Sequence, residues 1–275
     1  MKNILIPVDF SKCSLDAFNV AISVAKRTDA KLNVMVNVPD NYKKFVAYDF
    51  PLEFLNKDVF DDWVQKEKIV LDNLCAKQNV AYTLFTTQGD LVDEIKALLN
   101  ENDFDLIIMG THGASGLKQY TIGSNTQQIM RQVEVPVMVI KHAEEAVYYK
   151  NIVFLSTFNE VDIEPYKWTT QLAAYYDARI HLLSIDTPKF FSEIPFLVKS
   201  SMQEFQKIRP YIDSTLHYSN AFSAEAGLEK FLKKNEVDLV VVTTRGFKGF
   251  ASVLHFSTAE GIVNHFSIPV VSIKV

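Results

Sequence analysis

The sequence predicts an α/β fold made of two tandem, doubly wound domains, each a five-stranded parallel sheet with helices on both faces. Two observations predict this fold. Short, almost continuous apolar runs alternate with longer stretches of helical character, as expected when helices cover both faces of a parallel sheet. The same alternation then occurs a second time in the same order, which indicates a duplicated domain and not a short-period repeat.

Four short segments carry the duplication. They keep their order along the chain: 3–10 recurs as 151–158, 31–36 as 179–184, 104–109 as 237–242, and 135–141 as 268–274. A short polar connection near residues 142–146 separates the two sets. We therefore expect one domain at 1–142 and a second at 150–275.

In the first half, an apolar run between turn residues marks each strand. The expected strands lie near 3–8, 31–38, 80–86, 104–109 and 136–141, and the expected helices near 14–27, 53–78, 91–101 and 125–133. Gly89 and Asp90 predict a turn and an N-cap before the third helix. Residues 40–52 are expected to form a loop or lid. In the second half, the expected strands lie near 151–156, 179–185, 212–218, 238–244 and 269–274.

The composition limits the class of protein. The chain has 275 residues, of which 48% are hydrophobic and 22% charged, as in ordinary globular proteins. A net charge of −5 argues against a general nucleic-acid or membrane-surface role. No apolar run approaches the roughly 18 residues that span a bilayer. Cys13 and Cys75 are far apart and lack zinc-type spacing, so we expect a reduced, cytoplasmic protein.

The motif most indicative of function follows the apolar run 105–108. It consists of Met109-Gly110-Thr111-His112-Gly113, a nine-residue spacer, and Gly123-Ser124-Asn125 at the expected start of a helix. Glycines let the main chain approach a ligand closely, and the free N–H groups at a helix N-terminus favour a phosphate. A side chain at Gly110 or Gly123 is therefore expected to block ligand binding while the fold survives.

A second interpretation of these glycines stays open, because strand-to-helix turns also use glycine for packing alone. The spacing differs from the dinucleotide fingerprint, whose three glycines fall within six residues. It also differs from a Walker A loop, since no Gly-Lys-Ser/Thr ends it. His112 and Lys118 lie in the motif, and Cys13 lies near the expected start of the first helix; a solvated or inert role is the commoner one for such residues.

Other candidate residues stand at the carboxyl ends of the first two expected strands. Ligands of doubly wound sheets bind beyond these ends, where the direction of winding reverses. Pro7-Val8-Asp9 ends the first strand and Val38 the second. The carboxylate of Asp9 is suited to accept hydrogen bonds from a ribose or an adenine edge. Its alternative role is that of a cap for the helix expected near Ser14.

Taken together, Pro7-Val8-Asp9, Val38 and the long glycine pattern closely resemble the universal stress protein family, over essentially the whole chain. The resemblance implies strand order 3-2-1-4-5 in each domain. It also implies that Asp9 and Val38 hold the adenosine of a bound nucleotide. The phosphates would be held by Gly110, Gly113, Gly123 and Ser124, with Pro7, Met109 and Asn125 beside them. Asn125 departs from the small apolar residue that is commoner there.

The second half departs from this pattern at most positions. Thr157 replaces Asp9, Asp186 replaces Val38, Thr243 replaces Gly110, and Phe256 replaces Gly123. Only Gly246 and Ser257 match their counterparts. We therefore interpret the second motif as degenerate and expect one nucleotide for each chain.

The resemblance implies a stress-response regulatory protein that binds ATP or another adenine nucleotide, with or without Mg²⁺. The alternative is a nucleotide-independent scaffold or interaction module of the same fold, with protein partners that the sequence does not identify. Slow ATP hydrolysis is the most that we expect as enzymatic activity, because no Walker lysine, arginine finger or metal-binding carboxylate pair is visible. The family also implies pairing of the two last strands within the chain, as a pseudo-dimer. Whether two such chains form a further homodimer is left open by the sequence.

Overall fold

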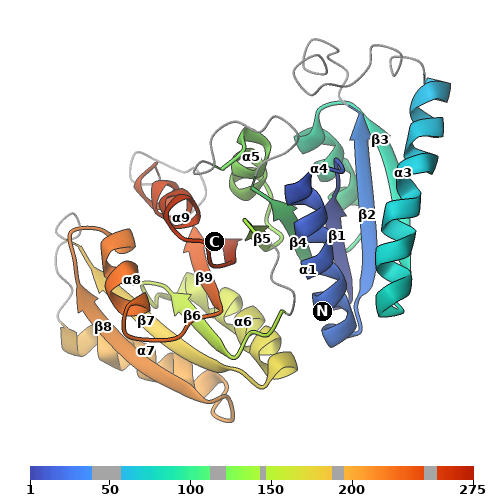
Figure 1. Cartoon of the computed structure of the whole chain (residues 1–275). Helices are drawn as coiled ribbons and strands as arrows, with labels where there is room; N and C mark the ends of the chain where they lie inside the picture. Colours follow the sequence, from blue (N-terminus) through green and yellow to red (C-terminus); the bar gives the residue numbers. More distant parts are fainter. Residues whose placement is uncertain (39–56, 112–121, 143–146, 188–194, 245–252) are drawn as a thin grey trace. The chain divides into compact units, whose positions relative to one another are not determined.

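The computed structural model describes residues 1–38, 57–111, 122–142, 147–187, 195–244 and 253–275 (Figure 1). These residues divide into two compact units. The first comprises Met1–Ile129 with Val139–Val147, and the second comprises Met130–Met138 with Tyr148–Val275. The second unit thus includes residues 130–138, which the sequence assigns to the first domain. The domain limits of 1–142 and 150–275 stay a prediction.

The first half of the chain forms a parallel sheet in the order β3-β2-β1-β4-β5. Its strands are β1 (Asn3–Pro7), β2 (Lys31–Val38), β3 (Tyr82–Gln88), β4 (Leu106–Gly110) and β5 (Val137–Ile140). The order 3-2-1-4-5 is therefore confirmed for this half. In the register of the central strands, Ile6 lies opposite Val34 and Ile4 opposite Leu106.

The helices of the first half cover both faces of its sheet. They are α1 (Lys12–Thr28), α3 (Lys57–Gln78), α4 (Leu91–Glu101) and α5 (Ser124–Gln132). Because the crossovers are right-handed and reverse direction after β3, α1 and α3 lie on one face, and α4 and α5 on the other. Residues Ile4, Leu5 and Ile6 of β1 are fully buried for this reason. A strand covered on both faces needs an uninterrupted apolar run.

Local signals fix where these helices begin. Ser11 is the N-cap of α1, since its side chain accepts a hydrogen bond from the main-chain N–H of Ser14. Asp90 caps α4 by accepting from the N–H of Val92 at 3.0 Å, and Gly89 has a φ of +147°. The turn and cap predicted at Gly89 and Asp90 are confirmed.

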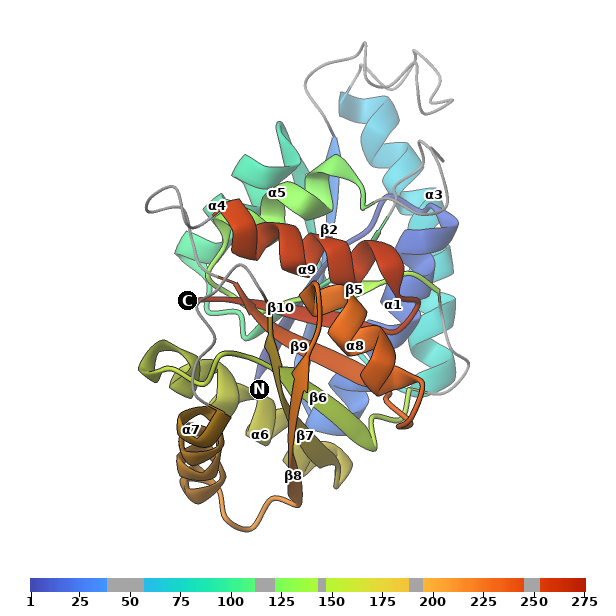
Figure 2. The ribbon, with the colours of Figure 1, turned by 90° about the vertical axis from the view of Figure 1, so that its left-hand side faces the viewer.

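The second half repeats the architecture with the order β10-β9-β6-β7-β8. Its strands are β6 (Asn151–Leu155), β7 (Arg179–Asp186), β8 (Ser214–Asn220), β9 (Leu239–Thr244) and β10 (Val270–Lys274). Its helices are α6 (Ile163–Tyr176), α7 (Pro195–Ile208), α8 (Ala224–Leu232) and α9 (Val253–His265). Within this unit α6 packs beside α7, and α8 beside α9 (Figure 2).

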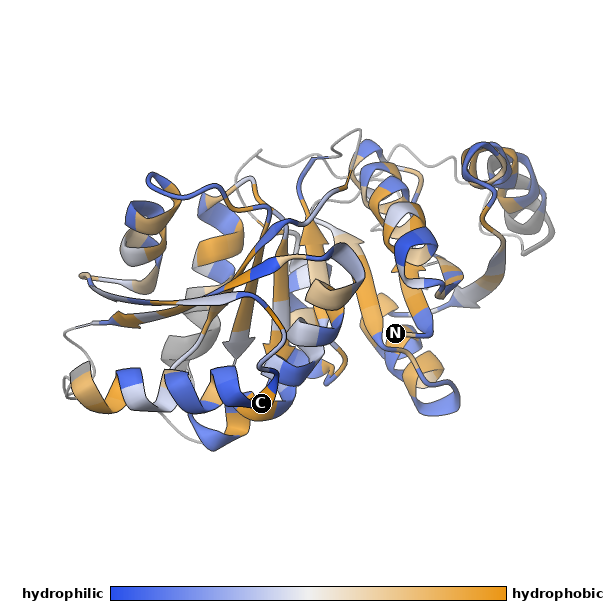
Figure 3. Ribbon diagram, turned by 90° about the horizontal axis from the view of Figure 1, so that it is seen from below, coloured by the Kyte–Doolittle hydropathy of each residue, from blue (hydrophilic) through white to orange (hydrophobic). Residues whose placement is uncertain are grey.

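Hydropathy follows this layering in each half. The strands are mainly apolar, and the helices alternate apolar and polar stripes (Figure 3). In the second half, ring contacts join Phe154 of β6 to Tyr166 of α6, and Tyr166 to Phe205 of α7. Among the described residues, none of the helices combines the length and the apolar character needed to cross a membrane.

Candidate functional site

The predicted site lies in the first unit, where β1 and β4 are neighbours. Leu5 lies opposite Ile107, so the carboxyl ends of the two strands reach the same edge of the sheet. The chain winds from β1 to β2 and β3 on one side and then returns to β4 on the other. The direction of winding reverses between β1 and β4, which is where doubly wound sheets bind their ligands.

The turn after β1 is organised by Asp9. Its Oδ1 accepts hydrogen bonds from the hydroxyl of Ser11 at 2.6 Å and from the main-chain N–H of Ser11 at 3.1 Å. Phe10, between them, has a left-handed φ of +59°. Asp9 does not cap α1 directly, as the alternative interpretation of the sequence had it, because Ser11 occupies the N-cap position. Asp9 instead orients the residue that caps the helix.

Gly110 is at the end of β4, directly against the first turn of α1. A β-carbon at this position would lie 2.8 Å from the carbonyl oxygen of Cys13 and 2.9 Å from its carbonyl carbon. These are main-chain atoms of α1, which cannot rotate away as a side chain can. The packing of α1 on β4 therefore requires a glycine here. The expectation that a side chain at Gly110 would affect only ligand binding is wrong for this reason.

Two hydrogen bonds fasten the end of β4 to the start of α5. The N–H of Gly123 donates to the carbonyl of Thr111 at 2.5 Å, and the hydroxyl of Thr126 donates to the carbonyl of Gly110 at 2.9 Å. Thr111 in turn donates its N–H to the carbonyl of Ile140 at 3.1 Å. We call this arrangement of Gly110, Thr111, Gly123 and Thr126 the strand–helix clasp. It fixes the N-terminus of α5 at the carboxyl edge of the sheet.

The strand–helix clasp decides which groups at this end can meet an anion. The N–H of Gly123 is already donated within the protein. The carbonyl of Gly123 accepts the N–H of Gln127 at 3.0 Å, which places Gly123 at the cap position of α5. The following residues, Ser124 and Asn125, have exposed side chains, and helix geometry gives their N–H groups no acceptor within the helix. These N–H groups lie at the positive end of the helix dipole.

The remaining predicted residues differ in which of their atoms can contact a ligand. Pro7 and Met109 are buried in the core, so only their main-chain atoms can meet a ligand. The main chain of Val38 ends β2, opposite Gln88. Gly113, like His112 and Lys118, lies outside the described residues.

The sequence did not single out all the residues that build this edge. Ser11, Thr111 and Thr126 hold it together by the hydrogen bonds described above. Cys13 lies beside them, with its Sγ 3.7 Å from the carbonyl oxygen of Lys141 and 3.9 Å from Oγ1 of Thr111. Partial burial lowers the pKa of Lys141 from its usual value. The sequence signal for these residues was their position directly after a strand or at a helix start.

The corresponding turn of the second unit is built differently. Thr157, at the position of Asp9, donates its hydroxyl to the buried carboxylate of Asp162 at 3.4 Å. The same carboxylate accepts the N–H of Asn159 at 3.0 Å, and the amide of Asn159 donates to Thr157 at 2.9 Å. The polar groups of this turn thus bind one another. Phe158 fills the interior beside it, against Phe205.

The second unit also carries a side chain where the first requires a glycine. Thr243 stands at the position of Gly110, in a strand that continues to Thr244. Before α6 begins, the chain forms a 3-10 turn, Glu160–Asp162, where the first unit already has the first α-helical turn of α1. The two units therefore differ in main-chain path at the carboxyl ends of β1 and β6. The side chains of Phe256 and Ser257 lie outside what the structure describes.

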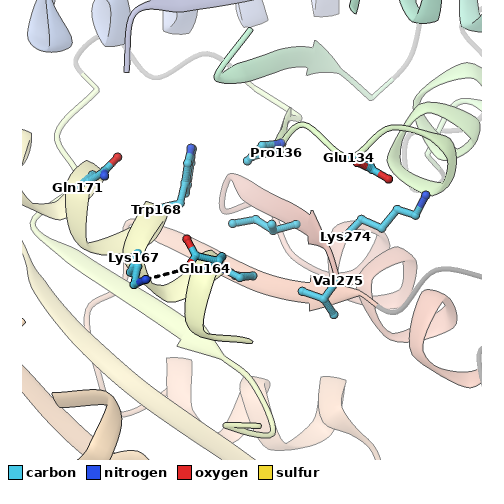
Figure 4. Close-up of a pocket in the computed structure, with 10 residues that line it drawn as sticks. Glu134, Pro136, Glu164, Lys167, Trp168, Gln171, Lys274 and Val275 are labelled. Atoms are coloured by element: carbon cyan, nitrogen blue, oxygen red, sulfur yellow. Dashed lines mark hydrogen bonds and ion pairs between the residues drawn. The ribbon is translucent and has the colours of Figure 1, made fainter. Parts of the chain in front are cut away.

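A pocket of about 640 Å³ lies in the second unit (Figure 4). Trp168 and Gln171 of α6 face it, and Glu164 and Lys167 beside them form an ion pair of 2.6 Å. The lining is completed by Glu134, Pro136, Pro165, Ile273, Lys274 and Val275. None of the described residues that are predicted to bind a nucleotide lines this pocket.

Comparison with known sequences points to one family. A family model described as the universal stress protein family matches residues 1–141 and 222–274. A Staphylococcus saprophyticus protein named as a universal stress protein is 35% identical over 145 residues, which are 52% of this chain and 85% of that protein. A Staphylococcus aureus (strain USA300) protein named likewise is 32% identical over 177 residues, which are 64% of this chain and 96% of that protein.

Comparison with solved structures extends the likeness to the whole chain. The crystal structure of a universal stress protein from Archaeoglobus fulgidus superposes with a TM-score of 0.78 at 16% identity, over 99% of this chain and 98% of that chain. A protein of Pseudomonas aeruginosa UCBPP-PA14, described as a universal stress protein, gives a TM-score of 0.67 at 16% identity, over 100% and 93%. At these identities the likeness concerns the fold.

Proposed function

The chain belongs to the universal stress protein family, and on this premise we propose that its first half binds one adenine nucleotide as the ligand of a stress-response regulatory protein. ATP is the form that the resemblance favours, and AMP would use the same adenosine contacts. The second half takes no nucleotide in this proposal. Its role is to complete the duplicated fold.

One observation carries the proposal. The strand–helix clasp fastens the start of α5 to the carboxyl end of β4, and the neighbouring strand β1 leads at the same edge into the turn that holds Asp9. A cluster of N–H groups at the positive end of a nine-residue helix is suited to a phosphate. A carboxylate on the neighbouring strand is suited to the hydroxyl groups of a ribose. In a nucleotide, a phosphate and a ribose are joined, so a single ligand would use both groups.

The proposal assigns a different part of the ligand to each group. The phosphates would accept hydrogen bonds from the N–H groups of Ser124 and Asn125, with the hydroxyl of Ser124 as a further donor. Asp9 would accept from the ribose, while its Oδ1 keeps Ser11 in place. Val38 would meet the adenine at the end of β2. Gly123 would contribute because it has no side chain to block the phosphates. Its N–H already donates to Thr111.

Magnesium would enter with the phosphates in this proposal. Among the described residues, no group of three or more His, Cys, Asp or Glu side chains is arranged to hold a metal ion. Phosphate oxygens would therefore supply most of the ligands of Mg²⁺, as is common for this ion. Hydrolysis needs a group that orients water and a cation that stabilises the transition state. We expect slow turnover at most.

The test of this function starts with the purified full-length chain. When the protein is denatured, mass spectrometry of the released small molecules should detect an adenine nucleotide. Calorimetric titration of the nucleotide-free protein with ATP, ADP and AMP should give one equivalent bound for each chain. A titration that ends at two equivalents would show that the second motif is functional. Absence of binding to any of the three would favour the scaffold alternative.

Variants then locate the site. Gly123→Val should abolish binding, because a β-branched side chain would stand at the helix end that faces the phosphates. The matched control is Ser257→Val, at the position of the second half that matches Ser124, which should leave the affinity unchanged. Equal affinity of Gly123→Val and the parent protein would contradict the assignment. Circular dichroism of each variant separates lost binding from lost structure.

A further inference from the structure

Two histidines of the second unit share one hydroxyl. The Nδ1 of His181 on β7 and the Nε2 of His217 on β8 each lie 2.8 Å from Oγ1 of Thr215. The two ring nitrogens lie 3.3 Å from each other. These three side chains form a closed triangle of polar atoms, which we call the histidine pair with its bridging threonine.

The sheet register brings these side chains together. Thr215 lies directly opposite His181, and His217 lies opposite Leu183, two residues further along β7. Since side chains alternate along a strand, all three point to the same face. Phe231 of α8 covers this face, with its ring centre 5.6 Å from that of His181 and 4.8 Å from that of His217. His181 is 7% exposed and His217 is half-buried.

Proton counting shows that the neutral pair fits this triangle. A threonine hydroxyl has one hydrogen to donate, and a neutral imidazole has one donor and one acceptor nitrogen. Thr215 can therefore donate to one ring nitrogen while it accepts from the other, and every polar atom of the triangle is satisfied. If the ring nitrogen that accepts from Thr215 is protonated as well, both ring nitrogens of the triangle become N–H donors that point at the same hydroxyl oxygen. The hydrogen of the hydroxyl would then have no acceptor within the triangle.

The surroundings offer little to offset that charge. Val153 of β6, beside His181, is apolar and buried, and the contact from α8 is the ring of Phe231. Two charged groups act on His181, Arg179 at the start of β7 and Asp213 just before β8, and they form an ion pair of 2.7 Å with each other. The charges on α8 and directly after it are Glu225, Lys230, Lys234, and an exposed ion pair of 2.7 Å between Glu229 and Lys233.

We propose that the histidine pair makes the packing of α8 on the second sheet acid-sensitive. Above the ordinary range of histidine protonation the triangle is closed and Phe231 rests on it. When a proton enters, His217, the more exposed ring, turns out toward solvent at the edge strand β8. Phe231 loses its contact, and Ala224–Leu232 separates from the sheet while the strands stay paired.

The sign of the effect follows from the direction of the pKa shifts. Burial lowers the pKa of His181 and of His217 from the ordinary value of 6.5, and for His181 the neighbouring His217 lowers it further. The open form, whose histidines are solvated, binds protons more readily than the closed form. The closed form is therefore favoured above pH 6.5 and loses population as the pH falls toward the lowered values. Each histidine changes the ratio of the closed to the open form by at most about tenfold for each pH unit.

Hydrogen exchange of the full-length chain at pH 7.0 and 5.5 tests the proposal, after correction for the intrinsic pH dependence of exchange. Peptides that cover α8 should lose protection about tenfold or more at the lower pH. Peptides from β9 should not. In His217→Gln the loss should disappear, because glutamine can bond to Thr215 but does not titrate. His142→Gln, at an exposed histidine of the first unit, is the matched control and should behave as the parent protein.

Two results would overturn the proposal. One is protection of α8 that does not depend on pH, or that depends on it equally in His217→Gln. The other is a rise in α8 protection when Zn²⁺ is added to the metal-free parent protein but not to His217→Gln, which would make the pair a cation site. If His217→Gln fails to fold, NMR titration of the parent's histidine rings decides instead. Both rings must titrate below the ordinary value of 6.5, and titration at or above 6.5 would refute the mechanism.

Discussion

Replacing Gly110 with alanine tests whether this glycine is present for packing. The added methyl group would lie 2.8 Å from the carbonyl oxygen of Cys13 and 3.2 Å from its Cβ. Contacts of this kind force the main chain to move, at a cost of about 1–3 kcal/mol. Against this, alanine restricts the unfolded chain more than glycine, which stabilises by about 0.5–1 kcal/mol. We therefore expect Gly110→Ala to lower the free energy of unfolding by about 1–2 kcal/mol.

Urea denaturation followed by circular dichroism measures this loss, with Thr243→Ala as the matched control at the corresponding position of the second unit. Thr243 already carries a β-carbon, so its shortening should change the free energy of unfolding by less. A second control adds Cys13→Ala to Gly110→Ala. The closest contact is with the carbonyl of Cys13 and not with its Sγ, so this change should not restore stability. Unchanged stability of Gly110→Ala, or its full rescue by Cys13→Ala, would refute the packing argument.

The remaining predictions concern the turn, the strand–helix clasp and the last strands. Ser11→Ala should lower the free energy of unfolding by about 1 kcal/mol through loss of the N-cap, and should weaken nucleotide binding by releasing Asp9; chemical denaturation and calorimetry measure the two effects separately. Thr126→Val removes the donor to Gly110 at nearly constant volume and should lower both stability and affinity, whereas Thr126→Ser should retain both. Pairing of the two last strands within the chain stays a prediction, and unprotected main-chain amides at both Val139 and Val271 in hydrogen exchange would contradict it.

Much of the fold could be predicted from the sequence because it depends on local patterns. Apolar runs, glycines and capping residues act within a few positions, so the alternation of strands and helices was recognisable, and the duplication made each half a check on the other. Boundaries moved by at most two residues, apart from the start of α3, which follows residues that the structure does not describe. One instance is β3, expected near 80–86 and observed at Tyr82–Gln88, where its pairing with β2 sets the limits. Pairing depends on a neighbour that is distant in sequence.

For the candidate site, too, the sequence predicted some features and left others open. The sequence located Asp9 and Gly110 at strand ends, because they follow apolar runs, and Gly123 at the start of a helix. It left two roles open for Asp9 and for the glycines. The choice between a cap and a ligand, or between packing and binding, depends on which atoms lie within about 3 Å. For Gly110 that atom belongs to Cys13, 97 residues earlier in the chain.

The sequence by itself determined the α/β class, the duplication, the family, and the half of the chain that carries the intact motif, because these follow from residue types and their spacing. Only the tertiary structure decided that Ser11 and not Asp9 caps α1, and that Gly110 is needed where α1 meets β4. It alone brought His181 and His217 to one hydroxyl. These features arise from parallel strands in register, which join residues that no local pattern relates.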